Sequence, residues 1–252
     1  VSPTKQFYHC FGCGAHGTAI KFVMEYDRLE FLDAVEELAK RVGMDVPRED
    51  RATRGPQDDF APLYAATRQA ADWFRQQLGN AASAKAYLQK RGVDAATQAK
   101  FELGFAPGGW DALLSALGRD EAARRTLDKV GLSSKNDAGK VYDKFRDRLM
   151  FPIHDRRGRV IGFGGRVMAA DEGPKYLNSP ETPLFRKGRE LYGLWQVKQA
   201  HARIPRLIVV EGYMDVVALF QYGIHEAVAT LGTATTPDHA ELLFRNASDV
   251  YF

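Results

Sequence analysis

The sequence predicts an α/β protein whose amino-terminal part is of α+β type. Residues 207–252 alternate between short apolar runs and helical patterns, a βαβαβ series that implies a parallel sheet. Residues 140–168 have the period of strands and follow an alanine-rich stretch of helical pattern. Residues 1–46 surround two cysteines and precede a polar segment bounded by prolines. These observations predict a small module, a mixed subdomain and the first part of a parallel sheet.

The length and composition are those of a globular protein. The chain has 252 residues, of which 45% are hydrophobic and 27% charged, so a buried core is expected. No stretch approaches the roughly 18–20 apolar residues that span a bilayer, which excludes a transmembrane protein. No basic-then-apolar leader opens the sequence, so secretion has no support, although its first residue, Val1, is not an initiator methionine. We therefore expect a cytoplasmic protein.

The charge is distributed unevenly, although the net charge is only +3. Residues 135–206 carry 16 Lys and Arg against 8 Asp and Glu, whereas residues 207–252 carry 1 against 6. A basic band next to an acidic segment suggests a polyanionic partner beside a carboxylate-bearing site. The alternative is two surfaces of opposite charge that neutralise each other.

The amino-terminal module, residues 1–46, contains an amphipathic helix after the cysteines. Apolar residues recur at helical spacing from Phe31 to Val42, and Gly43 follows as a left-handed cap. Residues 47–60 are polar and charged, which predicts an interdomain linker.

Residues 61–206 form the predicted basic, helical and mixed β subdomain. A helical pattern extends from Pro62 to about Leu117, with breaks at Gly79-Asn80 and Arg91-Gly92. Two strands follow, joined by a turn at residues 155–158.

Residues 207–252 contain the predicted parallel sheet. The apolar run Leu207–Val210 is expected to be a strand buried on both faces. Residues 227–229 and 250–252 are the next strands, and helices lie between them. Because the sequence stops within the last predicted strand, we expect this chain to be a fragment.

The run Cys10-Phe-Gly-Cys13 has the spacing of one knuckle of a zinc ribbon, in which a tight turn directs both thiolates at one ion. Structural zinc needs two further ligands, and the sequence has no second cysteine pair. A redox C-x-x-C motif is disfavoured because no βαβ unit follows, and a pair of ordinary turn thiols is the other alternative. We therefore expect half of a zinc site, with the other half before Val1.

Two carboxylates follow the first strand of the predicted parallel sheet. Glu211 comes directly after Leu207–Val210, at the carboxyl end of the strand, where ligands bind in open α/β sheets. Asp215 lies four residues later, in the first turn of the next helix. Such hard oxygen ligands suit Mg²⁺. The alternative is an exposed Glu and an Asp that stabilises a helix dipole.

The basic band contains a cluster of candidate nucleic-acid-binding residues. Gly162, Gly164 and Gly165 would allow the backbone to approach a phosphate chain, with Arg166 beside it. Tyr176 next to Lys175 combines a stacking face with a cation, which suits single-stranded nucleic acid. A solvated turn is the alternative for each residue, but the clustering weakens it.

Three stretches together resemble one family, the bacterial DNA primases. Residues 7–17 resemble the second half of that family's zinc ribbon. Residues 145–153, 162–166 and 175–182 resemble the basic subdomain of its polymerase core. Residues 209–215, Val-Val-Glu-Gly-Tyr-Met-Asp, are similar to the first motif of a toprim fold.

The resemblance implies a role for individual residues. Cys10 and Cys13 would bind zinc. Glu211 would be a catalytic carboxylate that binds magnesium (or manganese), with Asp215 as its catalytic neighbour. Arg166, Lys175 and Tyr176 would belong to the basic ridge that handles template or nucleotide, and Arg91 matches another basic position of the family, in the helical subdomain. The family's Asp-x-Asp motif should follow residue 252, so we expect this chain alone not to polymerise.

The resemblance also implies the activity and the partners. The activity would be Mg²⁺-dependent synthesis of short RNA primers from ribonucleoside triphosphates on single-stranded DNA, by a monomer at the replication fork. The replicative helicase and the single-strand-binding protein would contact regions outside this sequence. Another toprim enzyme, a nuclease or topoisomerase, and a non-catalytic single-strand-binding module are the alternatives.

Overall fold

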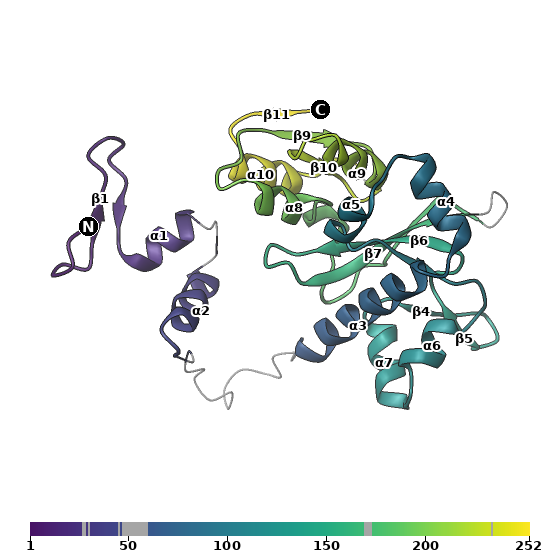
Figure 1. Cartoon of the computed structure of the whole chain (residues 1–252). Coiled ribbons are helices and arrows are strands. Elements are labelled where there is room, and N and C mark those ends of the chain that lie inside the picture. The colour runs from purple at the N-terminus through teal and green to yellow at the C-terminus, as the bar shows by residue number, and fades with distance from the viewer. Residues whose placement is uncertain (27–28, 30, 45, 47–59, 169–172, 233) are drawn as a thin grey trace. The chain divides into compact units, whose positions relative to one another are not determined.

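The computed structural model describes residues 1–252 except 27–28, 30, 45, 47–59, 169–172 and 233 (Figure 1). The chain divides into two compact units, Val1–Asp58 and Asp59–Phe252. The predicted linker, residues 47–60, lies outside the described residues except for Phe60.

The first unit contains a β-hairpin and two helices. Strands β1 (Tyr8–His9) and β2 (His16–Gly17) pair antiparallel, and helices α1 (Ala19–Tyr26) and α2 (Phe31–Arg41) follow. Gly43 has a φ of +69°, which confirms the predicted left-handed cap of α2. Val23 and Ala34 are buried in this unit.

The second unit begins with helices, as the sequence predicts. They are α3 (Ala61–Leu78), α4 (Ala82–Lys90), α5 (Ala95–Lys100), α6 (Ala112–Leu117) and α7 (Glu121–Lys129). The predicted breaks are confirmed, since Gly79 follows α3 and Gly92, with a φ of +69°, follows α4. The region is not wholly helical, because residues Gly104–Ala106 form strand β3 and pair with a distant strand.

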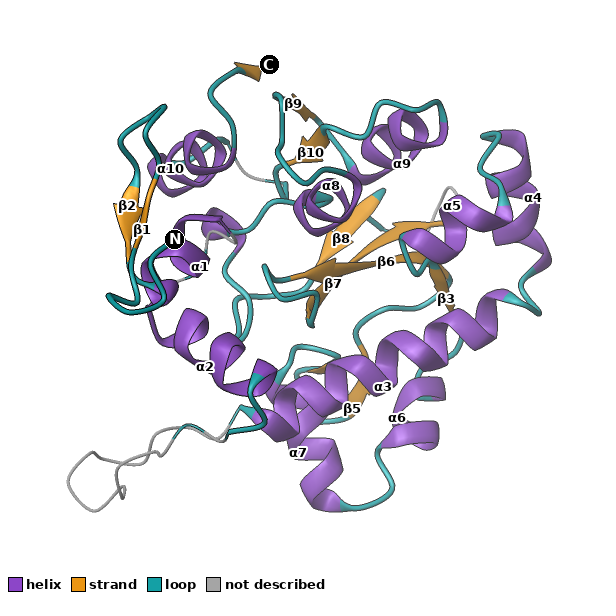
Figure 2. Ribbon diagram, turned by 60° about the vertical axis from the view of Figure 1, so that its left-hand side comes forward, coloured by secondary structure: helices purple, strands orange, loops and turns teal. Residues whose placement is uncertain are grey.

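A four-stranded antiparallel sheet forms the centre of the second unit (Figure 2). Its order is β3-β6-β7-β8, where β6 is Arg148–His154, β7 is Val160–Val167 and β8 is Tyr176–Asn178. On β6, Leu149, Phe151 and Ile153 join one buried cluster, whereas Met150 joins another with Phe74 of α3. Both faces of the sheet are therefore covered. Strands β4 (Ser133–Lys135) and β5 (Val141–Asp143) form a separate hairpin.

The predicted βαβαβ series is confirmed. Strands β9 (Leu207–Val210), β10 (Ala227–Ala229) and β11 (Val250–Tyr251) form a parallel sheet of order β10-β9-β11. Helices α9 (Tyr213–Gln221) and α10 (Pro237–Asn246) connect them, and η1 (Lys187–Arg189) and α8 (Leu194–Ala200) precede them.

Burial of β9 on both faces was a wrong prediction. Leu207 is buried, but Ile208, Val209 and Val210 are half-buried. One reason is that β11 pairs only with Leu207 and Ile208, so the carboxyl-terminal half of β9 has a single neighbouring strand.

Candidate active site

The carboxyl end of β9 carries two exposed carboxylates. Glu211 directly follows Val210, and Gly212 caps the helix whose first turn contains Asp215. The amide of Asp215 donates to the carbonyl of Gly212 at 3.2 Å. A Cβ on Gly212 would lie 3.4 Å from Asp215 Oδ2, so the carboxylate of Asp215 extends back over the turn toward the sheet edge. Exposed oxygens at this edge suit a hard divalent cation. Among the described residues, no group of three or more His, Cys, Asp or Glu completes such a site.

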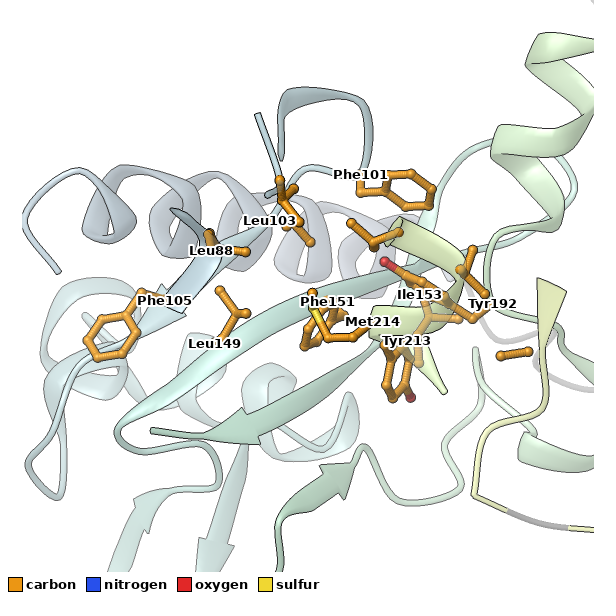
Figure 3. Close-up of a cluster of buried hydrophobic side chains, with 14 of the residues drawn as sticks. Leu88, Phe101, Leu103, Phe105, Leu149, Phe151, Ile153, Tyr192, Tyr213 and Met214 are labelled. Atoms are coloured by element: carbon orange, nitrogen blue, oxygen red, sulfur yellow. The ribbon is translucent and has the colours of Figure 1, made fainter. Parts of the chain in front are cut away.

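Tyr213, between these carboxylates in sequence, anchors the start of α9 on the antiparallel sheet (Figure 3). Its ring is buried, stacks on Phe151 at 5.1 Å between centroids, and meets Tyr192 edge-on at 4.7 Å. Burial raises the pKa of the Tyr213 hydroxyl, which donates a hydrogen bond of 2.6 Å to Asn178 Oδ1. Asn178 Nδ2 in turn donates to the carbonyl of Leu231 at 2.8 Å. One amide side chain therefore joins β8 to the first turn of α9 and to the loop that follows β10.

The basic residues selected from the sequence converge beside this anchor. Arg166 on β7 pairs in register with Tyr176 on β8. The guanidinium carbon of Arg166 lies 4.1 Å from the ring centroid of Tyr87 on α4, and that of Arg91 lies 5.4 Å from the same ring. Helix α4 thus brings Arg91 to Arg166 across 75 residues of sequence.

Tyr176 lies between the basic residues and the carboxylate edge. The Nζ atom of Lys175 is 5.9 Å from its ring centroid, and the ring of Tyr213 is 6.1 Å away. The pKa of Tyr176 is raised by burial first, and also by the proximity of Tyr87 and Asp215, whereas Arg166 lowers it. Its ring is half-buried, so it packs against the protein on one side rather than standing free as a stacking platform.

The three glycines of the basic band do not provide a phosphate cradle, contrary to the sequence-based expectation. All are buried in β7, and aromatic rings fill the space above them. A Cβ on Gly164 would overlap the ring of Tyr213, at 2.6 Å from Cε2, and one on Gly165 would lie 2.8 Å from Phe145 Cδ1. Their small size permits ring packing, which a linear motif cannot distinguish from backbone approach to a ligand.

The two cysteines form one knuckle. The amide of Cys10 donates to Ala15 at 2.7 Å, and the amide of Gly14, which has a φ of +75°, donates back to Cys10 at 2.9 Å. Hydrogen bonds from the backbone of Cys13 and Gly12, and from the side chain of Cys13, lower the pKa of the Cys10 thiol. Both thiols are free and exposed, so this turn could provide at most two of the four donors that structural zinc requires.

Sequence reasoning missed two residues of this site. Asn178 lies within residues 175–182, which resemble the basic subdomain, but the sequence predicts no function for it. Tyr87 precedes Arg91 by four residues, a spacing that places both side chains on one face of a helix. That spacing could have identified Tyr87, whereas the partners of Asn178 are set by tertiary packing.

Comparison with known proteins decides the family. Residues 1–54 match the family described as CHC2 zinc finger, and residues 206–252 match the Toprim domain. Residues 73–198 match the family described as DNA primase catalytic core, N-terminal domain. The chain belongs to the DNA primase family. Its strands β6–β8 and helix α4 fall in the primase core match, and Glu211 and Asp215 fall in the Toprim match.

Curated relatives named DNA primase are similar over the whole chain. The chain is 54% identical to one from Pseudomonas aeruginosa over 259 residues, covering 100% of this chain and 39% of that protein. It is 53% identical to one from Escherichia coli K12 over 256 residues, covering 99% and 44%. The chain therefore spans less than half the length of these relatives.

Solved primase structures have the same fold. The E. coli primase catalytic core aligns with a TM-score of 0.72 and 53% identity, over 75% of this chain and 60% of that one. A structure described as the DnaG primase catalytic domain bound to ssDNA has a TM-score of 0.72 at 53% identity, over 75% and 59%. The Aquifex aeolicus primase, with zinc-binding and RNA polymerase domains, has a TM-score of 0.70 at 39% identity, over 100% and 60%.

Within the described residues, no helix is long and apolar enough to cross a membrane.

Proposed function

We propose that this chain forms the template-handling and first metal-binding part of a primase that makes short RNA primers on single-stranded DNA. The observation that carries the proposal is the packing of the basic strands β7 and β8 against the start of α9. Through Tyr213, this packing places Arg166, Lys175 and Tyr176 beside the edge that bears Glu211 and Asp215. Tyr176 then has the basic side chains, which would bind phosphates, on one side. On its other side is the edge with Glu211 and Asp215, which would bind a metal.

The reaction is nucleotidyl transfer: a 3′-hydroxyl attacks the α-phosphorus of a ribonucleoside triphosphate, and the bond to pyrophosphate breaks. Mg²⁺ (or Mn²⁺), when bound, favours the 3′-alkoxide and offsets the charge of the leaving pyrophosphate. Glu211 and Asp215 would hold the metal, and Arg91, Arg166 and Lys175 would hold template or nucleotide phosphates through salt-dependent contacts. Tyr176 would contact a base or sugar with the accessible part of its ring.

Zinc would bind Cys10 and Cys13 in the amino-terminal unit, where it would fix the template-selecting module. We further propose residues 1–46, 47–60, 61–206 and 207–252 as zinc ribbon, linker, basic subdomain and toprim part. The protein would act as a cytoplasmic monomer at the replication fork, with the helicase and single-strand-binding protein as partners.

The deciding experiment is primer synthesis by the full-length gene product that contains this chain. The substrates are single-stranded DNA, labelled ribonucleoside triphosphates and Mg²⁺. Glu211→Gln is expected to reduce synthesis at least 100-fold, because a metal-binding charge is lost while the shape is kept. Glu241→Gln, a change at an exposed carboxylate of α10, is the matched control and is expected to retain wild-type synthesis.

Two outcomes would contradict the proposal. DNA cleavage in Mg²⁺ without incorporation of ribonucleotides would favour a toprim nuclease. Full synthesis by Glu211→Gln would remove the metal role of this residue and favour a purely nucleic-acid-binding part.

Zinc content is measured on the same preparations, and Cys10→Ser and Cys13→Ser are each expected to reduce it while leaving the thermal unfolding of residues 59–252 unchanged.

A further inference from the structure

We propose that Tyr87 is a positioning residue: the face of its ring holds the guanidinium of Arg166 in the orientation that contacts a nucleic-acid phosphate. Arg91 shares the same ring at a longer distance. The inference rests on the proposed function, because it assigns a support to one of the cations placed there. Tyr87 would not itself contact the template or nucleotide.

The geometry is that of a strong cation–π contact. The guanidinium carbon of Arg166 lies 4.1 Å from the Tyr87 ring centroid, well inside the limit of about 6 Å for this interaction. Tyr87 is half-buried on α4 and packs against the cluster that includes Leu88, Phe151 and Tyr213. The ring is therefore held by the core, and it offers Arg166 a fixed surface.

Within the part of the chain that the structure describes, no carboxylate pairs with this arginine. Its Nη1 donates to the carbonyl of Val167 at 3.1 Å, and its side chain also interacts with the hydroxyl of Tyr176, which is a neutral group. Its Nε is buried without a hydrogen-bond partner. By contrast, Arg68 is paired with Glu102 and Asp72. Because an aromatic face orients a guanidinium without cancelling its charge, Arg166 keeps its attraction for an anion.

A second tyrosine–arginine contact in the same unit provides a matched comparison. The guanidinium carbon of Arg159 lies 3.9 Å from the ring centroid of Tyr64, a geometry close to that of the Tyr87 contact. Asp155 also pairs with Arg159 at 2.7 Å. The Arg159 charge is thus already neutralised, so loss of the Tyr64 ring should not change nucleic-acid binding.

Removing the Tyr87 hydroxyl tests whether Arg166 depends on the ring or on the oxygen. This hydroxyl is buried and has no hydrogen-bond partner among the residues that the structure describes. Tyr87→Phe keeps the aromatic face and removes only an unsatisfied group, so it should preserve binding. Tyr87→Leu removes the face, and Tyr87→Met is a second variant of similar reach that also lacks it.

The test is fluorescence anisotropy of a labelled oligothymidylate with the full-length gene product, in EDTA and over a series of salt concentrations. Tyr87→Leu and Tyr87→Met are expected to weaken binding about 3- to 10-fold. The logarithm of the binding constant decreases linearly with the logarithm of the salt concentration. The magnitude of this slope should decrease by about 0.7, which corresponds to the loss of one phosphate contact to a single strand. Tyr87→Phe and Tyr64→Leu should stay within about twofold of wild type, with an unchanged slope. A purely structural role of Tyr87 would leave this slope unchanged.

Arg166→Gln distinguishes failure of the inference from failure of the proposed function. If Arg166→Gln weakens binding but the Leu and Met variants at position 87 do not, the positioning role is wrong and the phosphate contact stands. If Arg166→Gln retains wild-type affinity and slope, the phosphate role itself is wrong. The double variant Tyr87→Leu/Arg166→Gln should bind like Arg166→Gln alone, and additive losses would overturn the inference.

Discussion

Tyr213 and Asn178 are joined by a hydrogen bond of 2.6 Å between the tyrosine hydroxyl and the amide oxygen, across 35 residues of sequence. The bond fixes the first turn of α9, which carries Asp215, to the last residue of β8. The other end of α9 is also tied, because Gln221 accepts from the amide of Asp94 at 2.9 Å and donates to its carboxylate at 3.1 Å. The helix below the proposed metal edge is thus held at both ends by the subdomain that bears the cations.

Tyr213→Phe should lower the free energy of unfolding by about 1–2 kcal/mol, because Asn178 Oδ1 would lose its donor at a half-buried site. Urea unfolding monitored by tryptophan fluorescence measures this, since Trp73, Trp110 and Trp195 all lie in the second unit. Tyr222→Phe, at a tyrosine 75% exposed, is the matched control and should be neutral. Equal stability of the two variants would contradict the role assigned to this bond.

Gly164→Ala should destabilise the second unit by about 1–3 kcal/mol, because the added Cβ overlaps the buried ring of Tyr213. The same urea titration measures the change. Gly108→Ala adds a methyl group where no atom lies within 4 Å and should have little effect. A neutral Gly164→Ala combined with weaker phosphate binding would instead restore the cradle predicted from the sequence.

Glu102 should make stability depend on pH in the acid range. Its pKa is lowered to about 2, first by the hydrogen bond from His154 and then by Arg68. An acid with a depressed pKa binds more protons when unfolded, so its contribution is present above about pH 4.5 and is lost as the pH falls toward 2. The contribution is at most about 3 kcal/mol. The stability advantage of wild type over Glu102→Gln should therefore shrink from pH 5 to pH 2.5, whereas Glu121→Gln, at an exposed site, should show no such trend.

Glu190 should have the opposite pH dependence. Burial raises its pKa to about 7, and Arg156 only partly opposes this effect. Because the folded state then holds the proton more tightly, the contribution is full below about pH 4.5 and is lost as the pH rises through 7. Glu190→Gln stays neutral, so it should gain stability relative to wild type, by about 1–3 kcal/mol, between pH 5 and pH 8. Denaturation midpoints at four pH values measure this, and a constant difference would show that Glu190 does not titrate in this window.

Local patterns predicted much of the fold. Gly43 and Gly92 adopt the left-handed conformation that their positions after helices imply, and residues 155–158 turn between β6 and β7. Strand β3 was missed because its three residues lie in an alanine-rich stretch, and its pairing with β6 is more than 40 residues distant. Short strands take their stability from such partners rather than from their own residues.

The candidate site was predicted as a set of residues but not as an arrangement. Arg91, Arg166 and Tyr176 were selected from composition and resemblance, and the structure gathers them around Tyr87.

The sequence by itself determined the turn that holds the two cysteines, the βαβαβ order of residues 207–252, and the carboxylates after β9, because each depends on residues close together in the chain. Only the tertiary structure decided that Gly164 makes room for the ring of Tyr213 rather than for a phosphate. It also decided that the guanidinium of Arg166 lies over the ring of Tyr87. Periodicity reports which residues are buried, but the group that fills the space beside a buried residue comes from another element. That choice depends on long-range packing, which local sequence does not encode.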